Sequence, residues 1–298
     1  MSTDIFPLPP NYIFQTEIPS GFLGHTAIVK NSENQQNFIC KSIEKERIGG
    51  SDKIQRFKER LDHIQSVKNP YVLSYTEIID TQNHILLFRP YINSPPIIES
   101  FAPSTPDGPQ NTEAYDDETV FAFWTNICQC FHSMHSHHIF PNMIKPHNIF
   151  IVNKSSVVIT DLYPPSNDLD IMLHSPSSFD VGFLAPEFFN QQPTEIQSDL
   201  WSLGVLLCFM LTHSLPWPSK NLFTMLQQIN TCNIKFSRPI DPKYETIIRS
   251  LLQVNPEQRV LKLNFPSSPR SNAVIIDNQT ENTSPLAQKN DLRLNINQ

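Results

Sequence analysis

The sequence has 298 residues, 39% of them hydrophobic, and carries a formal net charge of −7. This length accommodates one large domain or two small ones, and the hydrophobic share is sufficient for an ordinary core. The 22 basic residues are scattered along an acidic chain, which argues against nucleic acid and anionic membrane surfaces as partners.

Cysteine usage and hydropathy predict the compartment. The cysteines are odd in number and irregularly spaced, and most lie inside expected strands or helices, which indicates reduced thiols rather than a disulfide framework. They are Cys40, Cys128, Cys130, Cys208 and Cys232. The sequence shows no leader pattern at its N-terminus and no run of roughly 18 apolar residues, the length that a membrane span needs. We therefore expect a cytoplasmic protein with no membrane partner.

The first third of the chain reads as a small antiparallel sheet with one helix. Residues 1–10 are rich in proline, and we expect them to form a disordered lead-in. Alternating and helical apolar spacings then follow one another. The expected elements are a hairpin over 12–30, a strand over 38–41, a helix over 54–67, and strands over 72–79 and 84–92.

The middle of the chain begins with a change of composition. Residues 93–115 are rich in Pro, Ser, Asp and Asn and predict a flexible insert. Acidic residues 116–118 then start a helix, where they favour the helix dipole, and an apolar face runs from Val120 to Met134. Four histidines close this helix and would either bind a metal or simply end it. They are His132, His135, His137 and His138.

Residues 139–161 read as two short strands joined by a turn. Lys145 and Asn148 stand three apart in Lys145-Pro146-x-Asn148, which puts an ammonium and a carboxamide at the mouth of one loop. The second strand ends at Asp161. The sequence therefore predicts a polar site at the ends of this hairpin.

Three further motifs follow in order. Ala185-Pro186-Glu187 closes a loop, Asp199 to Gly204 opens a strongly apolar helix, and Arg259 ends a Leu-Leu-x-x-Asn-Pro-Glu-x-Arg run. Beyond residue 262 the chain is rich in Asn, Ser and Gln, which predicts a disordered tail over 263–298.

Together these motifs resemble those of the eukaryotic protein kinase superfamily, whose catalytic loop reads His-Arg-Asp-x-Lys-Pro-x-Asn and whose next hairpin ends in Asp-Phe-Gly. The resemblance implies an α+β, bilobal kinase-like domain over 11–262. Its small β-sheet N-lobe with one helix would cover 11–92, and its larger, mostly helical C-lobe 93–262. It also implies that Asp199 supports the catalytic loop, that Glu187 pairs with Arg259, and that the histidine cluster is an ordinary helix end.

The resemblance also implies a nucleotide site for ATP and Mg²⁺. Two glycines would approach the phosphates, one lysine would grip them, two hinge backbone groups would hold the adenine, and an amide and a carboxylate would hold the metal. The corresponding residues are Gly21 and Gly24, Lys41, the carbonyl of Pro90 and the N–H of Ile92, and the metal ligands Asn148 and Asp161.

Several positions depart from the family pattern. Met143 stands where the catalytic Asp belongs, and it can neither accept nor orient the proton of a substrate hydroxyl. Other key positions are also changed, and either Glu59 or Arg60 stands where the family has the glutamate that holds the lysine. The changed positions are Pro19 for the first glycine, Asn142 for the Arg of the loop, Tyr163 for the Gly after Asp-Phe, and Asp180 for an activation-segment Thr.

These departures predict a catalytically impaired pseudokinase that binds Mg-ATP and acts on protein partners as a signalling scaffold or allosteric regulator. The alternative is a weakly active Ser/Thr protein kinase, because Lys41, Lys145, Asn148 and Asp161 are all present. For that case we hypothesise that Asp180 lies close enough to Lys145 to replace the missing base.

Overall fold

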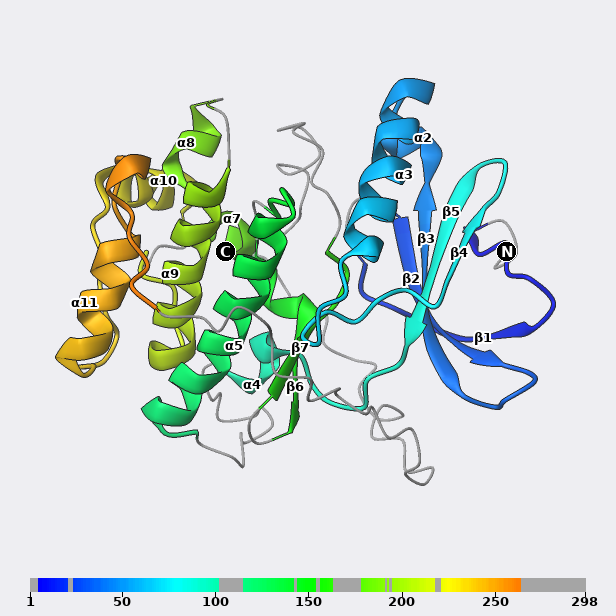
Figure 1. Cartoon of the computed structure of the whole chain (residues 1–298), viewed down its shortest axis with the longest axis horizontal. Coiled ribbons are helices and arrows are strands. Elements are labelled where there is room, and N and C mark those ends of the chain that lie inside the picture. The colour runs from blue at the N-terminus through cyan, green and yellow to red at the C-terminus, as the bar shows by residue number, and fades with distance from the viewer. Residues whose placement is uncertain are drawn as a thin grey trace, which may run out of the picture.

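The computed structural model has two lobes (Figure 1), a sheet lobe and a helical lobe. It describes residues 5–20, 24–101, 115–141, 144–153, 156–162, 178–190, 192, 195–217 and 221–263. The expected lead-in at 1–4 and the tail from 264 onward lie outside these ranges, as do Gly21, Asn142, Met143 and Tyr163.

The N-lobe is built on a five-stranded antiparallel sheet in the order β1-β2-β3-β5-β4. The strands are β1 (Tyr12–Ile18), β2 (Gly24–Asn31), β3 (Asn37–Glu44), β4 (Glu77–Asp80) and β5 (His84–Pro90). The strand expected over 72–79 is shorter than predicted. Val72 instead bridges to Ile159 in the other lobe, and the N–H of Leu73 donates to the Ile159 carbonyl at 2.9 Å.

One face of this sheet is covered by the N-terminal segment, so the prediction of a disordered lead-in is wrong for residues 5–10. Phe6 is only 4% exposed and packs in a cluster with Tyr12 and Phe88, and the Ser42 hydroxyl donates to the Ile5 carbonyl at 2.6 Å. The physical reason is that one large aromatic side chain outweighs a proline-rich neighbourhood when a sheet face needs cover.

The opposite face of the sheet carries helix α3 (Ser51–Ser66), which follows the short α2 (Lys45–Ile48). Phe57 and Leu61 of α3 pack with Ile43 and Leu87 of the sheet. Because side chains alternate along a strand, and cross-strand partners share a face, Ile39, Lys41 and Ile43 of β3 look the same way. Arg89, the register partner of Ile39, lies on that face too.

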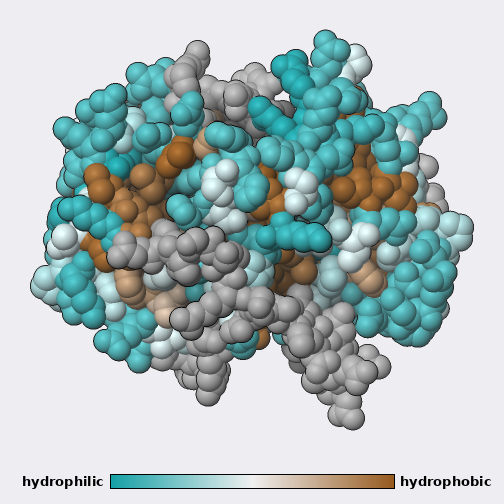
Figure 2. Space-filling model, viewed as in Figure 1, coloured by the Kyte–Doolittle hydropathy of each residue, from teal (hydrophilic) through white to brown (hydrophobic). Residues whose placement is uncertain are grey.

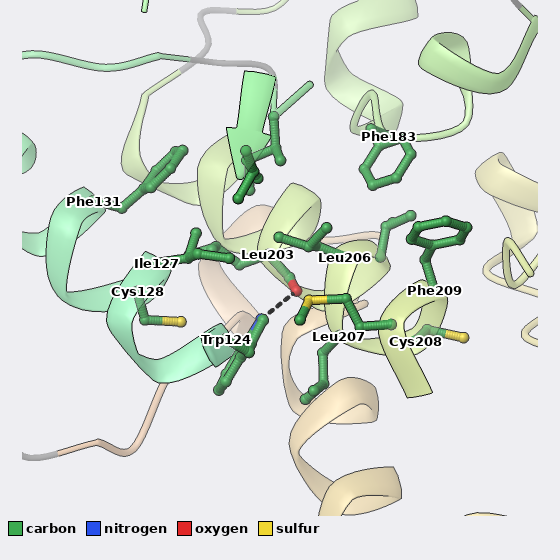
Figure 3. Close-up of a cluster of buried hydrophobic side chains, with 14 of the residues drawn as sticks. Trp124, Ile127, Cys128, Phe131, Phe183, Leu203, Leu206, Leu207, Cys208 and Phe209 are labelled. Carbon is green, nitrogen blue, oxygen red and sulfur yellow. Dashed lines mark hydrogen bonds between the residues drawn. The ribbon is translucent and has the colours of Figure 1, made fainter. Parts of the chain in front are cut away.

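The C-lobe is organised around α9 (Ile196–Thr212), which is buried along most of its length. Helix α5 (Asp117–Ser136) packs along it, and the Trp124 indole donates to the Leu203 carbonyl at 2.8 Å (Figure 3). Gly204 gives the third helix of this core, α11 (Pro242–Leu251), its close approach, because an added Cβ would lie 2.9 Å from the Cβ of Leu251.

The remaining elements complete the C-lobe. The hairpin of β6 (Ile149–Asn153) and β7 (Ser156–Ile159) follows the short 3-10 turn η1 (Pro146–Asn148) and lies on the side of the C-lobe that faces the sheet (Figure 1). The others are α4 (Ile97–Ser100), α7 (Ser178–Val181), α8 (Pro186–Phe189), α10 (Leu222–Thr231) and the 3-10 turn η2 (Pro256–Gln258).

The surface is mostly hydrophilic on the face seen in Figure 2, with apolar patches over both lobes. Phe223 of α10 is the most exposed large apolar side chain among the described residues, at 68%. Within the described ranges, no helix combines the length and the hydropathy that crossing a bilayer requires.

Candidate functional site

The site is centred on Asp161, which follows β7 where the two lobes meet. Its backbone takes the left-handed conformation, with φ of 55°, and its carboxylate is 1% exposed. The two residues before it, Ile159 and Thr160, donate backbone hydrogen bonds to different segments of the chain. The Ile159 N–H donates to the Tyr71 carbonyl at 2.7 Å, and the Thr160 N–H donates to the Asn148 carbonyl at 2.7 Å. The position of Asp161 is thus fixed by both lobes.

Lys41 reaches Asp161 from the sheet lobe. It lies in the middle of β3, between Thr26 of β2 and Leu87 of β5. Its Nζ is 2.9 Å from Oδ2 of Asp161, and the lysine side chain is 15% exposed. The structure therefore brings together two residues that the sequence assigned to the nucleotide site.

Arg89 is the third member of the site, and no sequence motif predicts its presence there. Its Nε donates to both carboxylate oxygens of Asp161 at 3.2 Å, and its Nη2 lies 3.2 Å from Oδ2. Its Nη1 donates to the Pro90 carbonyl at 3.3 Å, and the guanidinium stands 5.7 Å from the ring centre of Phe150. The available signal was a charged residue in the apolar strand His-Ile-Leu-Leu-Phe-Arg-Pro, since a buried arginine needs an acceptor.

Two hydroxyl groups complete the surroundings of the Asp161 carboxylate. Tyr75 donates to Oδ1 at 2.9 Å, and Thr160 donates to Oδ2 at 3.0 Å. Burial by itself would raise the pKa of Asp161, but the charges of Lys41 and Arg89 outweigh it and hold the pKa well below the ordinary value. The carboxylate is therefore ionised and each of its oxygens accepts from at least two groups.

A divalent metal does not fit this arrangement of Asp161. Mg²⁺ requires near-octahedral oxygen ligands at about 2.0–2.1 Å, with lone pairs directed at the ion. Here the lone pairs of both oxygens are directed at Lys41, Arg89 and two hydroxyls. Asp161 thus has the position expected from the sequence but holds cationic side chains.

The other residues expected to contact the nucleotide already make contacts within the protein or are buried. Gly24 lies in β2, where an added Cβ would come within 1.9 Å of the Ser42 carbonyl oxygen, so a close strand approach already requires glycine there. The Pro90 carbonyl accepts from the Arg89 side chain, and Ile92 is buried. Gly21 lies outside the described residues.

Neither candidate for the helix glutamate turns inward. Glu59 and Arg60 are both exposed on α3, and the Glu59 carboxylate accepts from Gln55 at 2.9 Å. The inward positions of this helix are the apolar Phe57 and Leu61. Asp161 is thus the carboxylate that the described contacts place against Lys41.

The catalytic-loop region is described only in part. Met143 lies outside the described residues, while Lys145 directly precedes η1. Asp180 of α7 is 8% exposed, and its Oδ1 lies 3.7 Å from Nδ1 of His147. A role for Asp180 or Lys145 in proton transfer stays a hypothesis.

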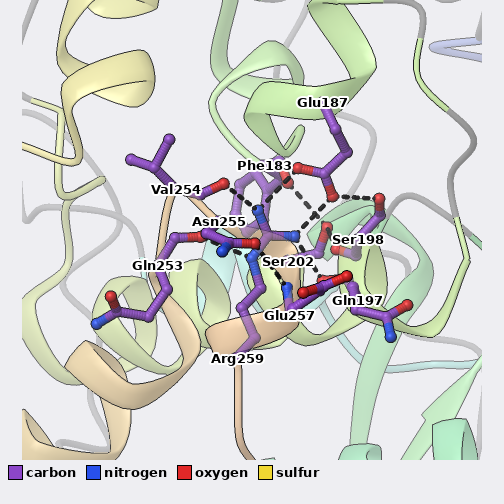
Figure 4. Close-up of polar contacts among 10 residues, drawn as sticks. All are labelled: Phe183, Glu187, Gln197, Ser198, Ser202, Gln253, Val254, Asn255, Glu257 and Arg259. Carbon is purple, nitrogen blue, oxygen red and sulfur yellow. Dashed lines mark hydrogen bonds and ion pairs between the residues drawn. The ribbon is translucent and has the colours of Figure 1, made fainter.

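The expected Glu187–Arg259 pair is confirmed (Figure 4). Arg259 donates through Nη1 and Nη2 to the two oxygens of Glu187 at 2.6 and 2.7 Å, and the Ser198 hydroxyl donates to the same carboxylate at 2.6 Å. The Arg259 guanidinium also donates to the carbonyls of Gln197 and Gln253. This pair locks α8 and the start of α9 against the end of the domain.

The histidine cluster behaves as a helix end. His135 shares a 2.8 Å hydrogen bond with Asp199, and His137 lies 2.8 Å from the Ser133 carbonyl. Among the residues that the structure describes, no group of three or more His, Cys, Asp or Glu side chains is arranged to hold a metal.

Comparisons with known proteins agree with this architecture. The family model described as "Protein kinase domain" matches residues 12–264. CBL-interacting protein kinase 21 of Oryza sativa subsp. japonica is 22% identical over 80% of this chain and 45% of its own. SNF1-like protein kinase ssp2 of Schizosaccharomyces pombe is 21% identical, over 84% and 42%. Serine/threonine-protein kinase SIK1 of Mus musculus is 23% identical, over 80% and 30%. The chain spans less than half the length of each of these three relatives.

Proposed function

Because this chain belongs to the protein kinase domain family, we propose that it is a catalytically impaired kinase domain that works by binding protein partners as a signalling scaffold or allosteric regulator. The carrying observation is the state of Asp161, whose carboxylate is held by Lys41 and Arg89. Phosphoryl transfer depends on metal ions that position the phosphates and neutralise their charge, and this carboxylate would have to hold such an ion.

The residue at the catalytic-base position supports the same proposal. Met143 has no proton acceptor, and a positioned base contributes roughly 10²–10⁴ in rate. That factor corresponds to about 3–5 kcal/mol of activation free energy. With the base missing and Asp161 engaged, little turnover is expected. A cytoplasmic location and protein partners are part of this proposal.

A weakly active Ser/Thr protein kinase is the second candidate. It is favoured by the retention of Lys41, Lys145, Asn148 and Asp161, and by relatives whose names describe Ser/Thr kinases. In this case Asp180 would serve as the base. Its side chain is buried, and its Oδ1 lies 3.7 Å from Nδ1 of His147. ATP and Mg²⁺ would then be required at the site that the sequence predicts.

A phosphate-transfer assay separates the two candidates. Purified protein is incubated with γ-labelled ATP, Mg²⁺ and generic Ser/Thr substrates, and transfer is compared with that of Asp161→Ala. The impaired domain should give no more transfer than this variant. Transfer that Asp161→Ala abolishes would contradict the proposal, and a further loss in Asp180→Asn would identify the replacement base.

A further inference from the structure

The charge balance around Asp161 is unusual for a metal ligand. Lys41 and Arg89 both contact its single carboxylate, at 2.9 and 3.2 Å. An arginine stays protonated at any physiological pH and presents its donors in a rigid fork that matches a carboxylate. The guanidinium of Arg89 is therefore a permanent cation held against both oxygens of the carboxylate that a metal would use.

The position of Arg89 is fixed by contacts other than the carboxylate. Strand β5 holds its backbone opposite Ile39, its Nη1 donates to the Pro90 carbonyl, and its guanidinium lies 5.7 Å from the ring centre of Phe150. Its side chain is only 6% exposed, so a move away from Asp161 would leave a buried charge without its carboxylate. The arginine is consequently a fixed part of the site.

We propose that Arg89 takes the place of the divalent cation at Asp161, so that this domain does not use Mg²⁺ to bind nucleotide. Arg89 is then a specificity-determining residue, which exchanges a mobile divalent ion for a fixed monovalent one. It also uses the Pro90 carbonyl, one of the two backbone groups expected to hold adenine. This inference goes beyond impaired catalysis, because a domain without a base could still bind Mg-ATP.

Calorimetric titration with ATP, in excess MgCl₂ and in excess EDTA, tests the inference on the wild-type protein. The apparent Kd should be the same in both buffers within about twofold, or binding should be absent from both. Binding that tightens about fivefold or more with Mg²⁺ would overturn the inference. If such binding came without phosphate transfer, the proposed function would still rest on the missing base at Met143, so the two failures are distinguishable.

Arg89→Met is the decisive variant, because it keeps much of the side-chain length and removes the charge. Its ATP affinity should become dependent on Mg²⁺, by a factor of about 5–150, the usual range for coupled sites. The additional change Asp161→Asn should abolish that gain. A variant that folds and shows no response to Mg²⁺ would overturn the role of Arg89.

Three further variants complete the experiment. Arg56→Met removes an exposed arginine of α3 in the same lobe and should behave as wild type. Arg89→Gln is the replacement if circular dichroism shows that Arg89→Met does not fold, and its results carry the same meaning.

Arg89→Lys keeps a cation beside Asp161, so its ATP affinity should remain insensitive to Mg²⁺. A gain in affinity with Mg²⁺ equal to that of the Met variant would contradict the charge argument.

Discussion

Two buried arginine–carboxylate clusters in the described part of the chain differ in charge balance. In the C-lobe, one arginine, Arg259, meets one carboxylate, Glu187, and the remaining contacts come from a hydroxyl and backbone carbonyls. Between the lobes, two cations, Lys41 and Arg89, meet the single carboxylate of Asp161. The first cluster is neutral, whereas the second carries an excess positive charge.

A carboxylate at a motif position therefore does not by itself define a metal site. Asp161 occupies the position that the sequence motif assigns to it, yet its partners come from β3, β5 and the loop that contains Tyr75. Glu187 has the partner that its motif predicts, because Arg259 belongs to the same structural scaffold. The identity of the partners decides whether a buried carboxylate has a structural role or is available to a ligand.

The largest expected effect is on the neutral cluster. Arg259→Met should destabilise the domain by about 3–5 kcal/mol, because it leaves the buried charge of Glu187 without its cation. Urea denaturation measures the loss. Arg249→Met is the matched control, since Arg249 is half exposed and pairs with Glu245 on the same helix surface, so it should cost only about 0.3–0.5 kcal/mol. Equal losses in the two variants would show that the buried pair contributes no more than a surface pair.

The second effect concerns the carboxylate shared by two cations. Asp161→Asn should cost about 1–3 kcal/mol, because the charge that holds Lys41 and Arg89 together is lost while the amide oxygen still accepts a hydrogen bond from one of them. Asp80→Asn offers a matched comparison. Asp80 also holds two cations, Lys45 and Lys58, but it is 40% exposed and its loss should stay below about 1 kcal/mol. A larger loss at Asp80 would contradict the importance of burial.

A pH dependence tests the charge of Glu187 in the neutral cluster. Burial raises the pKa of Glu187, but hydrogen bonds from Arg259 and Ser198 outweigh it and lower the pKa below the ordinary value. A depressed carboxyl pKa gives stability that is fully present above the ordinary value of about 4.3 and is lost as the pH falls through the folded value. The slope for one proton is at most about 1.4 kcal/mol per pH unit.

The measurement compares wild type with Glu187→Gln, which cannot ionise at this position. The difference in unfolding free energy should be constant near neutral pH and should shrink as the pH falls below about 4.3. A difference that does not change with pH would mean that the Glu187 charge is not the source of the stability.

The sequence predicted the scaffold better than the site. The two-lobe architecture and the Glu187–Arg259 pair were both implied by the resemblance to the kinase family, whose scaffold motifs this sequence retains in order. Arg89 was missed because no motif pairs it with Asp161. Separation along the chain is not the reason, since Arg89 and Asp161 are 72 residues apart and so are Glu187 and Arg259. Phe6 was missed because local proline content says nothing about an uncovered sheet face elsewhere.

The smallest change in stability is expected when Arg89 is replaced. Arg89→Met should change the unfolding free energy by less than about 1 kcal/mol, although the same substitution at Arg259 costs several times more. Asp161 retains Lys41 at 2.9 Å, with Tyr75 and Thr160 as hydrogen-bond donors, and the methionine can pack over the ring of Phe150. Urea denaturation of the two variants under one set of conditions makes the test. A loss at Arg89 as large as that at Arg259 would mean that both cations are needed to keep Asp161 buried, and the excess charge between the lobes would then be structural.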